Sequence, residues 1–127
     1  MSKKGLDKVT LRDSGKPRRG FIFSEDIANA AIFVLKNAGK LENTHYNVGT
    51  GVDTSIRDLA SMISSEVGFQ GEIKWDVTMH DGRQKKLLDS AKIKQLGWTS
   101  SVSIEHGLGS TYKWYLQNIE KMSKSGD

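Results

Sequence analysis

Two groups of basic side chains are the residues in this sequence best suited to binding an anion. Residues 16–19 lie in a turn that Pro17 stiffens, and residues 83–86 precede an apolar pair at 87–88. An arginine held in a stiff turn presents a planar pair of donors to phosphate, and an apolar anchor holds a neighbouring charge in place. The pattern predicts that the two groups converge on one diphosphate; the alternative is two ordinary basic surface loops.

Residues that would do covalent or metal chemistry are scarce. Cysteine is absent, which excludes disulfides, thiolate catalysis and cysteine-based zinc sites. The three histidines, His45, His80 and His106, never fall at the i, i+4 spacing of a helical metal pair. We therefore expect no metal site.

No dinucleotide fingerprint or acid–base pair is encoded. The turn Gly49-Thr50-Gly51 resembles half of a G-x-G-x-x-G motif but lacks the final glycine, so we interpret it as a strand-to-helix turn. Tyr112 has no lysine four residues later, and there is no G-x-S-x-G elbow. The carboxylates Glu25 and Asp26 fall in the first turn of a predicted helix, where acids are stabilising. We expect no cofactor bound by this chain and no catalysis by it alone.

Length and charge restrict the partners. The 127 residues suit one domain, with 36% hydrophobic and 27% charged residues and a net charge of +4. No basic stripe is interleaved with aromatic residues, so nucleic acid is not expected. The longest apolar run, residues 30–35, is too short to span a membrane, and the N-terminus lacks the apolar segment of a signal peptide. We expect a cytoplasmic protein with flexible ends at 1–7 and 121–127 around a domain at 8–120.

Strand and helix patterns alternate along the chain, which favours an α/β fold. The predicted strands are residues 8–12, 18–23, 45–48 and 72–76. Helices are predicted from Ser24 to about 37, from a Thr54 or Ser55 cap to 67, over 90–96, and from Ser103 until the pattern fades at 121. We expect a small, three-layer-like α/β domain with short strands and about four helices.

Apolar spacing identifies the face that each longer helix should bury. These faces are Ile27, Ala30, Ala31, Val34 and Leu35 in the first helix; Ile56, Leu59, Ala60, Ile63 and Val67 in the second; and Leu108, Thr111, Tyr112, Tyr115 and Leu116 in the last.

Several motifs together resemble one known family. They are Gly15-Lys16-Pro17-Arg18-Arg19-x-Phe21, Asp26-Ile27-Ala28, His45-Tyr46-Asn47-Val48-Gly49-Thr50-Gly51-Val52-Asp53, Ile56-Arg57-Asp58-Leu59-Ala60, Asp81-Gly82-x-x-x-Lys86-Leu87-Leu88-Asp89, Leu96-Gly97-Trp98 and Gly107-Leu108-x-x-Thr111-Tyr112-x-Trp114-Tyr115. In this order they closely resemble the C-terminal portion of the GDP-L-fucose synthases. Those enzymes are extended short-chain dehydrogenase/reductases of the NAD-dependent epimerase/dehydratase family. The resemblance covers residues 9–118.

The resemblance implies a division of labour. In the family, the N-terminal half holds NADPH and a Ser, Tyr and Lys catalytic set, and the C-terminal portion supplies the sugar-nucleotide pocket. The family's substrate-binding cations correspond to Arg19 and Lys86 here. Arg12 stands where the family usually has a tryptophan near the substrate, and we include it among the candidate substrate-binding residues. Gly20 replaces a glutamate, and the family's V-D-D segment reads Ser24-Glu25-Asp26.

Three functions remain open from the sequence. The chain is the GDP-sugar-binding portion of a larger enzyme, a free-standing binding module for a GDP-sugar or another diphosphate, or a structural or protein-interaction module that kept the fold and lost the ligand. Without the family's dinucleotide-binding half, helices that normally face it would expose an apolar patch. Such a patch predicts self-association or a protein partner.

Overall fold

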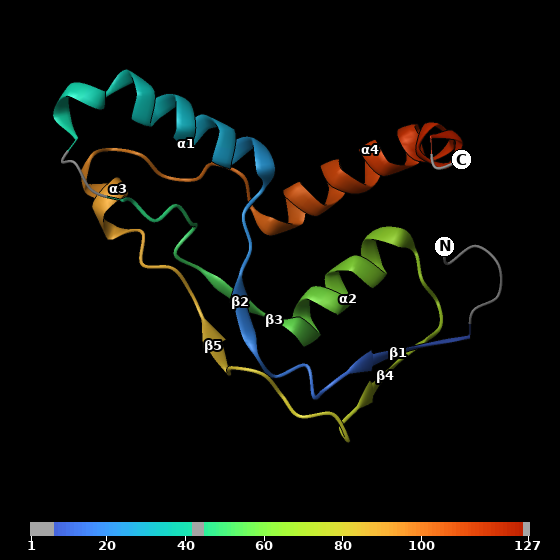
Figure 1. Ribbon diagram of the computed structural model, residues 1–127. Helices are drawn as coiled ribbons and strands as arrows, with labels where there is room; N and C mark the ends of the chain where they lie inside the picture. The colour runs from blue at the N-terminus through green and yellow to red at the C-terminus, as the bar shows by residue number, and fades with distance from the viewer. Residues whose placement is uncertain (1–6, 42–44, 126–127) are drawn as a thin grey trace.

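The computed structural model describes residues 7–41 and 45–125 (Figure 1). This part of the chain contains five strands and four α-helices, in the order β1-β2-α1-β3-α2-β4-β5-α3-α4, together with the 3-10 helix η1 (Ala38–Lys40) after α1. The strands are β1 (Lys8–Arg12), β2 (Arg18–Gly20), β3 (Asp53–Ser55), β4 (Glu72–Asp76) and β5 (Lys85–Lys86). The α-helices are α1 (Ser24–Lys36), α2 (Ile56–Val67), α3 (Ala91–Gln95) and α4 (Ile104–Lys124). The predicted α/β fold with short strands is confirmed.

The strands form two small sheets. In one, β1 and β4 pair in parallel, with Val9 opposite Ile73. In the other, the order is β3-β2-β5, where β2 is antiparallel to β3 and parallel to β5. Figure 1 shows α1 and α3 near one end of the three-stranded sheet, while α2 lies between α4 and the β1–β4 pair at the other end.

The buried core lies between α1 and α3. Ala30, Ile93 and Trp98 are buried. Partly buried side chains of α1 and of the segments after β2 and after residue 45 pack against them: Ile22, Phe33, Val34, Tyr46 and Val48. Helix α3 has only five residues, too few to be stable on its own, so it depends on the packing of Ile93 in this core rather than on helix propensity. This core fixes α1 and α3 beside the three-stranded sheet.

Local signals placed the ends of α2 correctly. The Ser55 side chain accepts a hydrogen bond from the Asp58 backbone N–H at 3.0 Å, which makes it the N-cap. At the other end Gly68 adopts a left-handed conformation with φ of 72°, which caps the last carbonyls.

The start of α1 differs from the prediction by one residue. Phe23, not Ser24, is the N-cap, and its carbonyl oxygen accepts the first helical hydrogen bonds from the N–H groups of Asp26 and Ile27. Phe23 is held in place because its side chain packs against Gly107 of α4. A tertiary contact therefore sets this boundary.

The strand predicted at residues 45–48 is wrong. This segment contains no strand; the nearest strand is β3, at Asp53–Ser55. Its alternating pattern reflects the packing of Tyr46 and Val48 against the core, not pairing with a neighbouring strand. The last helix also continues to Lys124, beyond the end predicted near 121, and the predicted N-terminal segment 1–7 lies outside the described residues except for Asp7.

The predicted buried faces are only partly buried. On α1, Ala30 is buried, but Ile27, Ala31 and Leu35 are exposed, with Leu35 at 76%. On α2 no residue is fully buried, and on α4 only Gly107 is. Helical periodicity identified apolar stripes correctly, but it carries no information on whether another element covers them. Among the described residues, no helix has the length and apolar character needed to cross a membrane.

Candidate functional site

The structure brings Arg19 and Lys86 together. They are register partners in the adjacent parallel strands β2 and β5. Neighbouring strands lie about 4.8 Å apart, and register partners project from the same face of a sheet. Two cations that are far apart in the sequence therefore share one face.

The other face of the same strands is neutralised. Arg18 and Lys85 are also register partners, and side chains alternate along a strand, so they project opposite to Arg19 and Lys86. Asp53 of β3 lies between them: its carboxylate accepts from Arg18 Nε at 2.9 Å and lies 3.8 Å from Lys85 Nζ. The hydrogen bond from Arg18, with the charges of Arg18 and Lys85, holds the pKa of Asp53 below its usual value despite partial burial.

The Arg19 guanidinium is fixed by backbone carbonyls. Its Nη1 donates to the carbonyl oxygens of Arg18 at 2.7 Å and Arg83 at 2.6 Å. These bonds use Nη1 and leave Nε and Nη2 with no partner within the described ranges. Lys86 is exposed and, in the same part of the chain, forms no ion pair or hydrogen bond. The geometry provides two uncompensated cationic groups on a rigid base.

The apolar pair after Lys86 acts as an anchor only in part. Leu87 is partly buried and packs against Gly20, where an added Cβ would lie 3.0 Å from the Leu87 Cδ1. Leu88 is 56% exposed, so the prediction that both leucines anchor the segment is wrong for this residue. The main support for Lys86 is the pairing of β5 with β2.

The turn before β2 is held from three sides. The Asp81 carboxylate accepts hydrogen bonds from the Ser14 backbone N–H and hydroxyl at 2.7–2.8 Å, and Arg57 donates to the Ser14 carbonyl oxygen at 2.7 Å. These hydrogen bonds from Ser14 lower the pKa of Asp81. Buried Gly15 has φ of 73° and lies against the ring of Trp75. The turn is thus a fixed support for Arg18 and Arg19.

Arg12 lies in the other sheet. It is the last residue of β1, is exposed, and its register partner is Asp76 of β4. The Asp76 carboxylate accepts hydrogen bonds from the backbone N–H and hydroxyl of Thr78. The structure therefore places Arg12 in the two-stranded sheet and not in the sheet that carries Arg19 and Lys86.

Asp26 has a structural position, as predicted for the first turn of α1. It is 1% exposed, and its two carboxylate oxygens accept from the Ser101 N–H and hydroxyl and the Val102 N–H at 3.0–3.1 Å. Burial by itself raises the pKa of Asp26, but these hydrogen bonds outweigh burial and lower it. The carboxylate joins α1 to the segment before α4.

A second feature of the site was not predicted. A pocket of about 400 Å³, here called the α4 pocket, lies between β3 and the start of α4. Its lining includes Phe21, Thr54, Ser100 and Glu105. The sequence indicated Thr54 only as a possible helix cap, because the pairing of β3 with β2 has no local signal.

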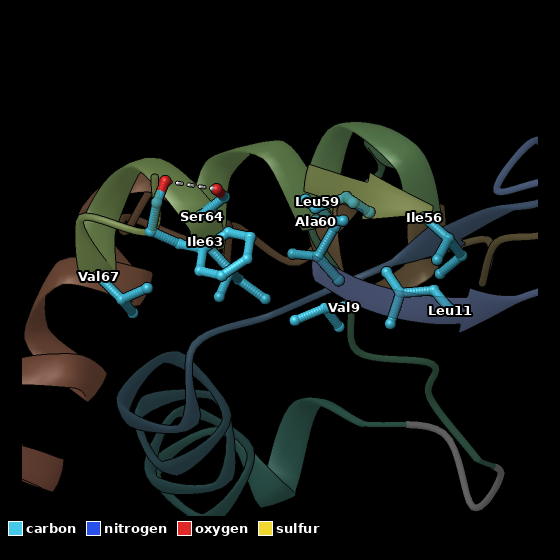
Figure 2. A pocket seen from close by; sticks show the side chains of 10 residues that line it. Val9, Leu11, Ile56, Leu59, Ala60, Ile63, Ser64 and Val67 are labelled. Atoms are coloured by element: carbon cyan, nitrogen blue, oxygen red, sulfur yellow. Dashed lines mark hydrogen bonds between the residues drawn. The ribbon is translucent and has the colours of Figure 1, made fainter. Parts of the chain in front are cut away.

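An apolar groove of about 340 Å³ lies beside α2 and β1 (Figure 2). Figure 2 shows side chains of α2 and β1 directed into the same space. Nine of the ten lining residues are apolar; the tenth is Ser64, whose hydroxyl donates to the Phe69 carbonyl oxygen at 3.5 Å. The apolar residues are Val9, Leu11, Ile56, Leu59, Ala60, Ile63, Val67, Phe69 and Ile73. Within the described residues there is also no cluster of three or more potential metal ligands.

Comparison with known proteins identifies the relatives of this chain. Residues 1–49 match the model of the NAD dependent epimerase/dehydratase family. The chain is 43% identical over 115 residues to GDP-L-fucose synthase 1 of Arabidopsis thaliana, which covers 91% of this chain and 35% of the plant protein. It is 44% identical over 120 residues to GDP-L-fucose synthase of Escherichia coli, covering 89% and 37%.

Solved structures agree. A GDP-6-OMe-4-keto-L-xylo-heptose reductase from Campylobacter jejuni superposes with a TM-score of 0.80 at 36% identity, covering 88% of this chain and 34% of that one. A GDP-L-fucose synthetase from Naegleria fowleri, bound to NADP, gives 0.80 at 25% identity, covering 89% and 36%. The resemblance predicted from the motifs is confirmed, and the chain spans about a third of the length of these relatives.

Proposed function

We propose that this chain, a relative of the GDP-L-fucose synthases over about a third of their length, supplies the GDP-sugar-binding surface of such an enzyme. Arg19 and Lys86 bind the diphosphate in this proposal. The observation that carries it is their pairing in register on one face, where no acid of the described residues neutralises them. Relatives named for GDP-sugar chemistry support the choice of ligand.

The chemistry of the two side chains suits a diphosphate. Arg19 keeps Nε and Nη2 free for one phosphate oxygen pair, and the Lys86 ammonium adds a second charge one strand away. Hydrogen bonds between charged groups contribute about 1.5–3 kcal/mol each. The opposite pair, Arg18 and Lys85, is a poorer site because Asp53 already occupies it. We also propose Arg12 as a third cation, because it is exposed at the end of β1, where the chain turns toward β2.

NADPH, which the family uses, has no fitting site in the described residues. The glycine turn at 49–51 leads into β3 rather than directly into a helix, and Lys94 lies against Gly51. A dinucleotide fingerprint needs glycines that open directly onto a helix N-terminus. The proposed role of this chain is therefore binding of the GDP-sugar without the cofactor.

The test compares two neighbouring lysines on opposite faces. Binding of GDP-mannose to the 127-residue chain is measured by calorimetry for wild type, Lys86→Ala and Lys85→Ala. Both variants remove the same charge one residue apart, so net charge and long-range attraction change equally. We expect Lys86→Ala to weaken binding about tenfold and Lys85→Ala to weaken it less than about twofold. Equal losses in both variants, or no saturable binding by wild type, would contradict the proposal.

A second function is favoured by the apolar groove. Its residues include Ile63, which is 42% exposed, and the face of α2 that periodicity marked as buried. Soluble domains rarely leave such a surface uncovered unless it binds a partner. We infer that the groove is a protein-interaction surface at which the remaining length of a fucose synthase-like enzyme packs; self-association of this chain is the other outcome.

The test of the groove is the substitution Ile63→Glu. The control is Leu116→Glu, at an exposed residue of α4 outside the groove. We expect wild type and Leu116→Glu to bind a hydrophobic dye and Ile63→Glu to bind it less. Light scattering distinguishes the occupants: a wild-type dimer dissociated by Ile63→Glu indicates self-association. A wild-type monomer that binds no dye would count against an interaction surface.

A further inference from the structure

We propose that Asp81 is a positioning residue that orients the Arg19 guanidinium through the loop at residues 77–84. The inference rests on the proposed function, in which Arg19 binds a diphosphate. Asp81 has no contact with the ligand in this proposal. Its carboxylate anchors the loop between β4 and β5, and the backbone of that loop holds the guanidinium.

The loop contacts Arg19 through two consecutive residues. The Arg83 carbonyl oxygen accepts a hydrogen bond from Arg19 Nη1 at 2.6 Å. A Cβ added to Gly82 would lie 3.5 Å from Arg19 Nη2, so the backbone of Gly82 lies beside the other terminal nitrogen. The directions in which the free Nε and Nη2 point therefore depend on where this stretch of backbone lies.

Asp81 anchors the stretch that touches Arg19. Its carboxylate accepts hydrogen bonds from the backbone N–H and the hydroxyl of Ser14 at 2.7–2.8 Å. In the described part of the chain, the other hydrogen bonds of residues 77–82 stay within the loop or run to the end of β4. Arg83 follows two residues after Asp81, and two residues span at most about 7 Å, so fixing Asp81 limits where the Arg83 carbonyl can lie.

The turn before β2 is a firm base for this anchor, because it is tied to the start of α2. The Gly15 carbonyl oxygen accepts from the Arg57 N–H at 2.9 Å. The Pro17 carbonyl oxygen accepts from the Ile56 N–H at 3.0 Å. The Arg57 side chain also donates to the Ser14 carbonyl oxygen at 2.7 Å. Figure 1 shows the loop between β4 and β5 running alongside this turn, so the turn is the fixed partner and the loop is the dependent one.

Lys86 has a support that does not involve Asp81. It lies in β5, which pairs with β2, and the Gln84 carbonyl oxygen before β5 accepts from the Arg18 N–H at 2.7 Å. These bonds hold β5 against β2 whether or not the carboxylate is present. Loss of the Asp81 carboxylate should therefore release the guanidinium of Arg19 and leave Lys86 in place.

The charge of Asp81 taken alone gives the opposite expectation for an anionic ligand. Hydrogen bonds from Ser14 lower the pKa of Asp81, so the carboxylate is ionised at neutral pH. A negative charge near a cationic site repels a diphosphate, and its removal should strengthen binding. If Asp81 positions Arg19, its removal should weaken binding. The sign of the change therefore separates the two roles.

The experiment measures the affinity of the 127-residue chain for GDP by calorimetry in wild type, Asp81→Ala, Asp81→Asn and Asp76→Ala. Asp81→Asn keeps one acceptor for the Ser14 N–H and is the conservative variant. Asp76→Ala is the matched control, because it removes an equal charge at the start of the same loop, where the carboxylate accepts from Thr78. Circular dichroism and thermal melts establish that each variant is folded.

We expect Asp81→Ala to weaken GDP binding about fivefold, because binding must then order the released guanidinium. Asp81→Asn should recover most of this loss, and Asp76→Ala should bind GDP at least as tightly as wild type does. Combined with Arg19→Ala, the substitution Asp81→Ala should cause no further loss. Without ligand, the NMR signal of the Arg19 Nε–H group should shift in Asp81→Ala and not in Asp76→Ala.

Unchanged or tighter GDP binding by Asp81→Ala, or a further loss when it is combined with Arg19→Ala, would overturn the positioning role and leave the diphosphate site standing. If wild type binds no GDP, the proposed function fails. The Arg19 signal then decides the orientation by itself: a shift in Asp81→Ala supports it, and an unchanged signal overturns it.

Discussion

At the scale of single residues, the site depends on side chains whose charge is either compensated or left free. Asp53 pairs with Arg18 and Lys85. Arg19 donates hydrogen bonds to carbonyl oxygens from only one nitrogen, Nη1, and Lys86 forms no hydrogen bond or ion pair with the described residues. Asp26 and Asp81 serve the scaffold, because both accept hydrogen bonds from residues distant in the sequence. These acids therefore hold the structure together, while no acid of the described residues pairs with Arg19 or Lys86.

A substitution at Gly15 tests how much the turn before β2, which supports Arg18 and Arg19, depends on glycine. An alanine there would place its Cβ 2.7 Å from the ring of Trp75 in a backbone conformation with φ of 73°. Positive φ costs about 1 kcal/mol for a side chain other than glycine's, and overpacking adds about 1–3 kcal/mol. We expect Gly15→Ala to lower the free energy of unfolding by about 2–4 kcal/mol in urea. Gly39→Ala, with nothing within 4 Å of the added Cβ, is the control and should change it little.

The lowered pKa of Asp26 predicts that the stability of the fold depends on pH. Its pKa is lowered in the folded protein, so ionised Asp26 contributes stability at neutral pH that is lost as pH falls through the folded pKa, below about pH 4. We expect Asp26→Asn to be less stable than wild type at pH 7 and the difference to shrink toward pH 3. Thermal melts of both proteins across this range measure it. Glu25→Gln, the exposed neighbour, is the control, and a difference independent of pH would contradict the assignment.

At the scale of elements, pairing and packing decide what the helix and strand patterns leave open. The hydrogen-bonded start and left-handed end of α2 are local features, so the sequence predicted both. The meeting of β2 with β5 joins distant segments and has no local pattern, so only the basic residues themselves indicated it. At residues 45–48 the sequence predicted a strand that does not form, because alternating apolar residues indicate burial as readily as strand pairing.

The cap of α2 offers a test at this scale. Ser55 is 8% exposed and accepts from the Asp58 N–H, and it also ends β3, so it joins the sheet to the helix. We expect Ser55→Ala to destabilise the fold by about 1 kcal/mol. Urea denaturation followed by circular dichroism measures the change, with Ser61→Ala on the exposed side of α2 as the control. Equal midpoints for Ser55→Ala and wild type would show that the cap contributes nothing.

At the scale of the whole molecule, one face of the three-stranded sheet carries Arg19 and Lys86, and an apolar groove lies along α2 and β1. The sequence predicted the resemblance to the GDP-L-fucose synthases and the α/β fold with short strands. It did not predict that the groove lies along α2 and β1, or that the α4 pocket adjoins the cations, because both depend on how the two small sheets are set relative to the helices. The chain spans about a third of its relatives' length.

The most direct test of the central claim is an NMR titration of the 127-residue chain with GDP-mannose, repeated for Arg19→Ala and Lys86→Ala. We predict saturable shifts at the amides of β2 and β5, and a midpoint at about tenfold higher ligand concentration in both variants, since each removes one of the two free cations. Saturable shifts that stay unchanged in both variants, or that arise only at the groove beside α2, would contradict a diphosphate site on this face.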